Sequence, residues 1–234
     1  MVRVMSLSAK NVLITGAEGA LGSVVLRKFA SAGVTAIGTY LKAPHPEIPE
    51  SERVKWVKMD VTQAKSVQDG IKALAARGIE IDGLVHCAGG FRYLSFEKTS
   101  DEDLDFLFNT NLRSAFLLIR EVLGGMKKQG FGRIVLISSK STLNAASGLA
   151  AYSAAKSGLN MIVSSLADEV RAFDINVNAV MPTVIDTAAN RKDMPTADFA
   201  TWVKPQELAE IIFSLTQPWG KPIHGALIPV AGRV

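Results

Sequence analysis

Short apolar runs alternate along the chain with longer segments in which apolar residues recur every three or four positions. Seven such runs lie at residues 11–15, 34–39, 54–59, 83–87, 133–138, 176–180 and 226–230. The first of them reads as a buried strand, and together they predict the strands of a parallel sheet. The longer segments have the period of amphipathic helices.

Local signals place several of these helices. One carries Leu21 and closes at Gly33, and a second begins at Thr62 and ends near Gly78. Ser100, with Asp103 three residues later, predicts the cap of one long helix through Asn111 to Met126. Further helices carry Tyr152 and begin at Pro205, a residue that suits a first helical turn.

This alternation predicts an α/β protein with a doubly wound parallel sheet of about seven strands. The chain has 234 residues, of which 48% are hydrophobic, so it can bury a substantial core. Strands and helices follow one another throughout and leave no room for a second domain. We therefore expect residues 1–234 to form one domain.

The net charge and the cysteine content indicate which kinds of partner and which cellular compartment suit the protein. The net charge is +4, yet the basic residues are scattered, which predicts a solvated surface and no nucleic-acid partner. The single cysteine, Cys87, excludes an internal disulfide and favours a reducing compartment. No run approaches the ~20 apolar residues of a membrane span, and none before Asn11 suits a signal peptide. We expect a cytoplasmic, soluble protein with no membrane partner.

A glycine-rich turn follows the first strand. Gly16, Gly19 and Gly22 lie between that strand and an apolar helix. Glycines let backbone N–H groups approach a pyrophosphate, and the helix N-terminus adds the positive end of its dipole. The turn therefore predicts a dinucleotide site, with a simple tight connection as the alternative.

Three residues further along the chain suggest proton transfer. Lys156 lies four residues after Tyr152, on the same face of one predicted helix, and Ser139 follows the fifth strand. A phenol ionises near pKa ~10 unless a nearby positive charge stabilises the phenolate. Lys156 supplies such a charge and Ser139 a hydrogen bond, which together suit proton transfer to a carbonyl oxygen.

Together these residues resemble the short-chain dehydrogenase/reductase family over essentially the whole chain. Its Thr-Gly-x-x-x-Gly-x-Gly loop corresponds to Thr15–Gly22, with Ala20 in place of the middle glycine of that pattern, and its Ser and Tyr-x-x-x-Lys set to Ser139, Tyr152 and Lys156. The resemblance implies a single-domain Rossmann fold and an NAD(P)-dependent oxidoreductase acting on a small carbonyl or alcohol substrate. It implies a homodimer or homotetramer as well.

The resemblance also implies the site residues. The catalytic set is Asn111, Ser139, Tyr152 and Lys156. Lysine would lower the tyrosine pKa and bind the nicotinamide ribose, and Asn111 would hold a water. The cofactor contacts are Gly16, Glu18, Gly19, Ala20, Leu21, Gly22, Tyr40, Lys42, Asp60, Val61, Cys87, Ala88, Gly89, Tyr152, Lys156, Pro182, Thr183, Val184 and Thr187.

A variable segment narrows the substrate. Residues 186–202, within a lid expected at about 186–204, resemble the same region of dihydropteridine reductases, and so does the loop containing Ala20. Those enzymes usually lack the serine that Ser139 provides, so a quinonoid pterin and an ordinary carbonyl both stay open. The substrate residues expected are Phe91, Ser139, Phe199 and Trp202, although Phe91 equally suits covering the sheet edge and the last two equally suit core anchors.

Cofactor choice depends on the end of the second strand, where NAD enzymes generally place an acidic residue against the ribose. Tyr40 occupies that position, and Thr39 and Lys42 flank it. With no carboxylate there to repel a 2′-phosphate, the sequence favours NADP(H), with NAD(H) as the alternative.

Two further alternatives concern binding. His86, at a strand end, is predicted to be a packed core histidine, because no His, Cys or Asp cluster has metal-ligand spacing. We expect no metal. A rival function is a non-catalytic dinucleotide sensor or scaffold, since fold alone does not establish activity.

Overall fold

The computed structural model describes residues 9–234, which build one seven-stranded sheet with every pair of neighbouring strands parallel. The strand order is β3-β2-β1-β4-β5-β6-β7. The strands are β1 (Asn11–Thr15), β2 (Thr35–Tyr40), β3 (Val54–Lys58), β4 (Gly83–His86), β5 (Phe131–Ile137), β6 (Asp174–Pro182) and β7 (Leu227–Val230). The predicted doubly wound α/β fold is confirmed.

The order of the strands reverses between β1 and β4. From β1 the chain builds outward through β2 and β3, then crosses back to place β4 on the other side of β1. Thr15 pairs with His86 at the carboxyl ends of these two strands. Ligands of such sheets bind in the crevice outside this switch point.

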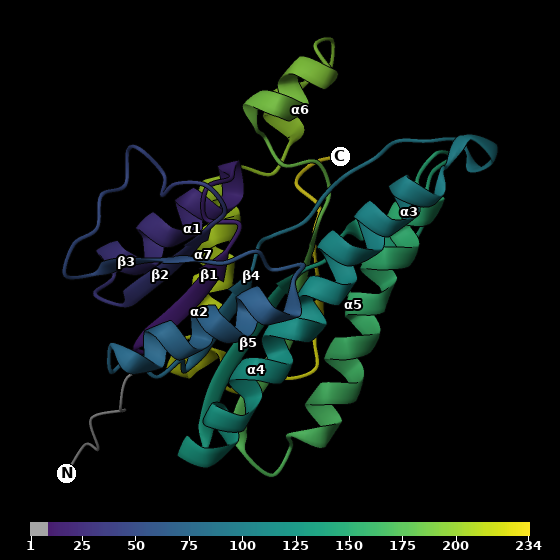
Figure 1. The fold of residues 1–234 in the computed structure, drawn as a ribbon. Helices are drawn as coiled ribbons and strands as arrows, with labels where there is room; N and C mark the ends of the chain where they lie inside the picture. Colours follow the sequence, from purple (N-terminus) through teal and green to yellow (C-terminus); the bar gives the residue numbers. More distant parts are fainter. Residues whose placement is uncertain (1–8) are drawn as a thin grey trace.

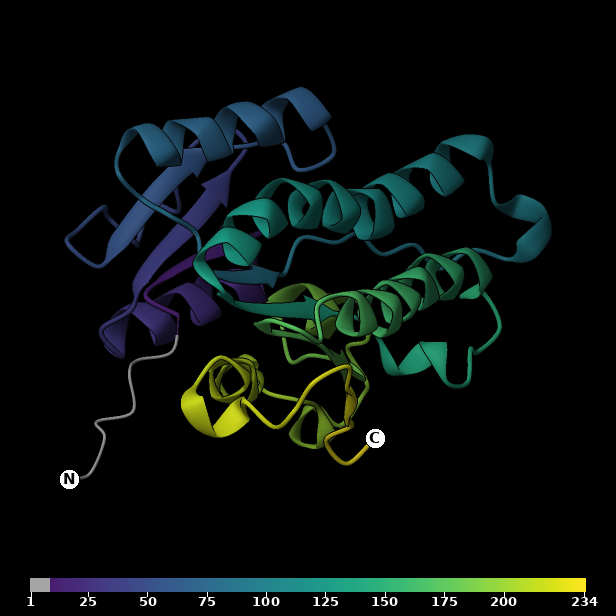
Figure 2. The ribbon, with the colours of Figure 1, turned by 90° about the horizontal axis from the view of Figure 1, so that it is seen from below.

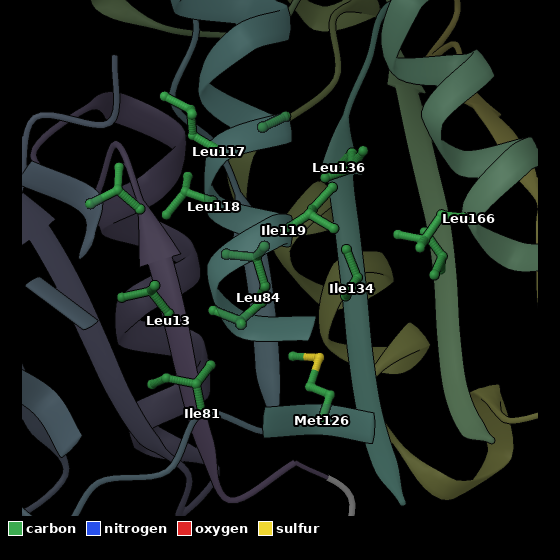
Figure 3. Close-up of a cluster of buried hydrophobic side chains, with 14 of the residues drawn as sticks. Leu13, Ile81, Leu84, Leu117, Leu118, Ile119, Met126, Ile134, Leu136 and Leu166 are labelled. Atoms are coloured by element: carbon green, nitrogen blue, oxygen red, sulfur yellow. The ribbon is translucent and has the colours of Figure 1, made fainter. Parts of the chain in front are cut away.

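Helices cover both faces of the sheet (Figures 1 and 2). On one face α1 (Ala20–Ser31) packs against α7 (Pro205–Leu215), where the rings of Phe29 and Phe213 meet edge to face with centroids 5.1 Å apart. The other face carries α2 (Ala64–Ala76), α4 (Ser114–Gln129) and α5 (Ala150–Glu169). Strand residues such as Leu13, Leu84 and Ile134 fill this second core together with Leu117, Leu118 and Ile119 of α4 (Figure 3).

The helix predicted from Ser100 to Met126 is interrupted. Ser100 caps α3 (Asp101–Phe108) with the expected capping box, but a π-helical turn, η2 (Asn109–Arg113), separates α3 from α4. Asn111 sits in this turn, and its Nδ2 donates to the carbonyl of Leu107, the acceptor that its backbone N–H takes in a regular α-helix. The amide side chain therefore competes with the backbone at the point where the helix widens.

Residues 186–202 form an excursion from the sheet. Ile185 and Val203 pair as a parallel bridge at its base, where the N–H of Asp186 donates to the carbonyl of Val203 at 2.8 Å. The excursion holds α6 (Ala188–Asp193), which stands off the body in Figure 1, and the short helix η4 (Phe199–Thr201). The remaining short helices are η1 (Phe96–Lys98), η3 (Lys140–Thr142) and η5 (Pro218–Gly220). In the part of the chain that the structure describes, no helix could cross a membrane.

Candidate active site

In the glycine turn after β1, backbone segments approach one another closely at positions that have no side chain. Gly16 has φ +63°, and a Cβ there would lie 2.9 Å from the backbone N of Ala88. A Cβ on Gly22 would lie 2.1 Å from the carbonyl oxygen of Gly16. The turn thus brings chain segments closer than side chains allow, and it leads directly into the N-terminus of α1. These features fit a bound pyrophosphate.

Alanine replaces the middle glycine of the family pattern without filling this space. Ala20 is exposed and is the first residue of α1, preceded by Gly19 in extended conformation at the N-cap. An exposed side chain is not packed inside the turn. The departure from the family pattern therefore leaves the close approach between Gly16 and Gly22 intact.

Sequence reasoning missed a hydrogen-bonded chain through His86. Its Nδ1 lies 2.9 Å from Thr15 Oγ1, and its Nε2 lies 3.0 Å from Ser114 Oγ. Ser114 donates to the carbonyl of Thr110 in the π turn, and Thr15 accepts from the N–H of Ala88. Neutral His86, protonated on Nε2, satisfies every bond, and burial lowers its pKa to about 3. The predicted core histidine thus joins the ends of β1 and β4 to η2.

The other predicted cofactor residues lie at the carboxyl edge of the sheet, after β2, β3, β4 and β6. Several already have structural partners. Asp60 Oδ1 accepts from the N–H and hydroxyl of Thr62, Thr183 donates to the carbonyl of Ala231, and Thr187 caps α6 by accepting from the N–H of Asn190. These bonds shape the loops that surround the crevice.

Tyr152 and Lys156 lie one turn apart near the start of α5. The Nζ of Lys156 is 5.9 Å from the Tyr152 ring centroid and donates to the carbonyl of Ile137 at 2.7 Å. Burial lowers the pKa of Lys156 to about 8 and raises that of the Cys87 thiol to about 12. Burial also raises the pKa of Tyr152, while a hydrogen bond from Ser139 opposes that rise. Here burial, rather than the lysine, determines the direction of the tyrosine pKa shift.

Ser139 is held by a row of hydroxyl groups. Ser153 of α5 donates to Ser141 Oγ at 3.0 Å, and Ser141 Oγ lies 2.9 Å from Ser139 Oγ. The backbone N–H of Ser141 also donates to Ser139 Oγ at 3.2 Å. With the Ser141 proton directed to Ser139, the oxygen of Ser139 accepts two bonds and its own proton is free to point outward. Such a hydroxyl donates to a substrate oxygen or a phenolate.

Asn111 completes the cluster. Its Oδ1 accepts from the N–H of Gly90, and its Nδ2 donates to the carbonyls of Gly90 and Leu107. A Cβ on Gly89 would lie 2.8 Å from Asn111 Oδ1 and 3.3 Å from Lys156 Nζ. Asn111, Lys156 and Tyr152 thus meet at the loop after β4, and Ser139 joins them through its hydrogen bond with Tyr152. Asn111 holds that loop directly, a contact that its expected role as a water ligand did not anticipate.

The predicted substrate residues divide into two groups. Phe91 is 59% exposed, and its ring meets that of Tyr152 edge to face at 5.0 Å, so it lies at the mouth of the site. Trp202 is 5% exposed and packs against Phe199 with ring centroids 4.8 Å apart. The guanidinium of Arg191 covers the Phe199 ring at 4.8 Å. The alternative of Trp202 as a core anchor fits this burial, and substrate contact by Phe199 or Trp202 stays a prediction.

One premise about the cofactor is corrected. The sequence around Tyr40 contains no acidic residue, but the structure brings one from the glycine turn: Glu18 Oε2 accepts from the N–H of Leu41 at 3.0 Å. A carboxylate therefore does lie at the end of β2. The argument for NADP(H) loses its main support.

Comparison with known proteins places this geometry in a family. The sequence pattern of the family described as short chain dehydrogenase matches residues 10–198, the span from the first strand into the excursion. The chain belongs to the short-chain dehydrogenase family. This dehydrogenase is therefore an NAD(P)-dependent oxidoreductase. Separately, among residues 9–234 no group of three or more His, Cys, Asp or Glu side chains is placed to hold a metal ion.

Similar proteins span nearly the whole of this dehydrogenase. The 3-oxoacyl-(acyl-carrier-protein) reductase FabG of Vibrio cholerae is 30% identical over 97% of this chain and 98% of its own. The acetoacetyl-CoA reductase of Allochromatium vinosum is 29% identical, over 96% of this chain and 98% of its own. The structure of a putative gluconate dehydrogenase from Agrobacterium tumefaciens superposes with a TM-score of 0.86 at 25% identity, covering 97% of this chain and 96% of the other.

Proposed function

We propose that this dehydrogenase reduces a small carbonyl substrate, or oxidises the corresponding alcohol, with Tyr152 as the proton donor or acceptor. One observation carries the proposal: the hydroxyl of Ser139, the phenol of Tyr152 and the ammonium of Lys156 come together at the carboxyl edge of the sheet, beside a turn that fits a pyrophosphate. This is the edge at which such sheets bind dinucleotides.

A bound NAD(P)H would supply hydride to the electrophilic carbon. The residues of this chain would do the rest. Ser139 would donate a hydrogen bond to the substrate oxygen, which gains negative charge as the carbon is reduced. Tyr152 would give its proton to that oxygen and leave a phenolate, and the Lys156 ammonium would stabilise the phenolate. The glycine turn and α1 would hold the pyrophosphate.

The alternative substrate is a quinonoid dihydropterin. The likeness of residues 186–202 to dihydropteridine reductases favours it, and the excursion stands beside the crevice. The built hydroxyl row around Ser139 favours an ordinary carbonyl instead, because a second hydrogen-bond donor stabilises developing charge on oxygen. We give the carbonyl precedence, since this row is a contact of the site itself.

A substrate panel tests the proposal. The purified protein is mixed with NADH or NADPH and with short and long ketones, aldehydes, 3-oxoacyl thioesters or quinonoid dihydropterin, and loss of absorbance at ~340 nm reports turnover. We expect turnover with at least one carbonyl. Turnover with the pterin alone would favour the alternative substrate. Cofactor binding without turnover of any compound would indicate a non-catalytic sensor.

We also propose that the protein assembles as a homodimer or homotetramer through α4 and α5. These helices frame a groove lined by Phe116, Ile119, Leu123, Met161 and Ile162, and Phe116 and Met161 are 57% and 65% exposed. An apolar surface of this kind suits a self-complementary contact with a second copy. The single cysteine favours a reducing, cytoplasmic location for the assembly.

A charge in the groove should separate the copies. We expect Met161→Glu to weaken association by about 30-fold or more, because it places a carboxylate in an apolar contact. Light scattering after gel filtration would show a fall towards the 25.0 kDa monomer. Phe96→Glu, at an 84% exposed position on η1, is the control and should keep the parent mass. A wild-type mass already equal to the monomer would reject this interface.

A further inference from the structure

The carboxylate of Glu18 is fixed at a particular place. Glu18 lies in the turn between β1 and α1, and Leu41 is the first residue after β2. The two strands are adjacent and parallel, with Ile14 level with Gly38, so both segments emerge from the same edge of the sheet. The 3.0 Å hydrogen bond from the Leu41 N–H to Glu18 Oε2 joins them.

This place matters for an adenine dinucleotide. When a pyrophosphate lies against the first helix of such a fold, the ribose of the adenosine half reaches the end of the second strand, where an acidic residue accepts from its 2′-hydroxyl. Here Tyr40 takes the usual position of that residue, and the acidic group comes from the turn after β1. A carboxylate has about four acceptor positions, so one bond to Leu41 leaves capacity for a hydroxyl.

We propose that Glu18 is the residue that selects the cofactor, favouring NAD(H) by accepting a hydrogen bond from the ribose 2′-hydroxyl and repelling the 2′-phosphate of NADP(H). The inference rests on the proposed function, since it needs a dinucleotide in the glycine turn. A phosphate monoester carries a charge of about −1.5 to −2 at neutral pH, so the carboxylate opposes it with nearly twice the strength it would exert on a single charge.

The surrounding charges leave this repulsion uncompensated. Glu18 is exposed, and within residues 9–234 no ion pair joins it to a cation. Lys42 follows Leu41 and is exposed. Water therefore screens its charge, and an exposed charge of this kind attracts a phosphate only weakly. Glu18 is held in place by the backbone, whereas Lys42 extends on a flexible stem. The carboxylate of Glu18 should therefore influence the choice of cofactor more than the ammonium of Lys42 does.

Binding of the reduced cofactors to the full-length protein tests the inference without any substrate. Isothermal titration calorimetry would give dissociation constants of NADH and NADPH for the wild type, Glu18→Gln and a control, Glu47→Gln. The control makes the same chemical change at an exposed carboxylate that pairs with Arg27. We expect the wild type to bind NADH about tenfold more tightly than NADPH, and the ratio to approach one in Glu18→Gln through tighter NADPH binding. Glu47→Gln should keep the wild-type ratio.

Each outcome has a separate meaning. A wild type that prefers NADPH, or a ratio unchanged by Glu18→Gln, overturns the assignment of Glu18. Failure of the wild type to bind either nucleotide would instead reject the proposed function. Higher ionic strength provides a further check, because the discrimination against NADPH should shrink as salt screens the exposed carboxylate. A ratio that does not respond to salt counts against an electrostatic origin.

Discussion

Tyr152→Phe should lower turnover at least about 100-fold and leave the dissociation constant of the reduced cofactor nearly unchanged. The variant loses the proton that the reaction delivers to the substrate oxygen. Phenylalanine keeps the ring and with it the edge-to-face contact with Phe91 at 5.0 Å, so the walls of the site should stay in place. Steady-state rates with the best carbonyl of the panel, together with calorimetric cofactor binding, measure both quantities.

The matched control is Tyr93→Phe. It removes the same hydroxyl from a tyrosine that is 67% exposed on the loop after β4. We expect wild-type turnover from this variant. Near wild-type turnover from Tyr152→Phe would show that another group supplies the proton, whereas loss of cofactor binding would show that the phenol is part of the nucleotide site instead.

Gly22→Ala should disrupt the glycine turn itself. The added methyl would lie 2.1 Å from the Gly16 carbonyl oxygen and 2.6 Å from its carbon, both backbone atoms that cannot rotate away. Overpacking of this kind costs about 1–3 kcal/mol, which corresponds to a fall in melting temperature of roughly 2–12 °C for a chain of this length. Because the displaced turn presents the N–H groups to the pyrophosphate, cofactor affinity should fall about 100-fold.

Gly124→Ala on α4 makes the same change where space is open. A Cβ there has nothing within 4 Å. Alanine is favoured over glycine in a helix by about 1 kcal/mol, so this control should raise the melting temperature and leave cofactor affinity alone. Thermal unfolding followed by circular dichroism should show a lower melting temperature for Gly22→Ala and a higher one for Gly124→Ala. Wild-type cofactor affinity in Gly22→Ala would contradict the role assigned to the turn.

The strands and their parallel arrangement could be predicted because strands buried on both faces are apolar throughout. The runs around Leu13 and Ile134 lie within β1 and β5. The π turn at Asn111 could not be predicted, because widening a helix by one residue leaves no clear change in apolar period. The turn coincides with tertiary contacts, the bonds between the Asn111 amide and Gly90, which lie far from it in the sequence.

In the candidate site too, some residues could be predicted from the sequence and others could not. Tyr152, Lys156 and the glycine turn are recognisable because their spacing within one segment carries the chemistry. The contacts that position the site residues come from separate segments. Ser153 supports Ser139 through Ser141, and Glu18, in the turn after β1, accepts from Leu41 at the end of the neighbouring strand β2. Nothing in the local sequence around Tyr40 indicates that a carboxylate arrives from the preceding turn. Such contacts are evident only once the strands are in register.

The bridge between Ile185 and Val203 makes the excursion a separable part of the protein. Its two ends are already neighbours, and Trp202 is buried at its base, so residues 186–202 can change in length or composition without altering the path of the strands that carry the chemistry. Where this segment contacts the substrate, as we propose, a change within it should alter substrate choice and leave the strands in place. Exchange of the whole segment between Ile185 and Val203 would therefore separate its part in substrate choice from the chemistry of Tyr152 and Lys156.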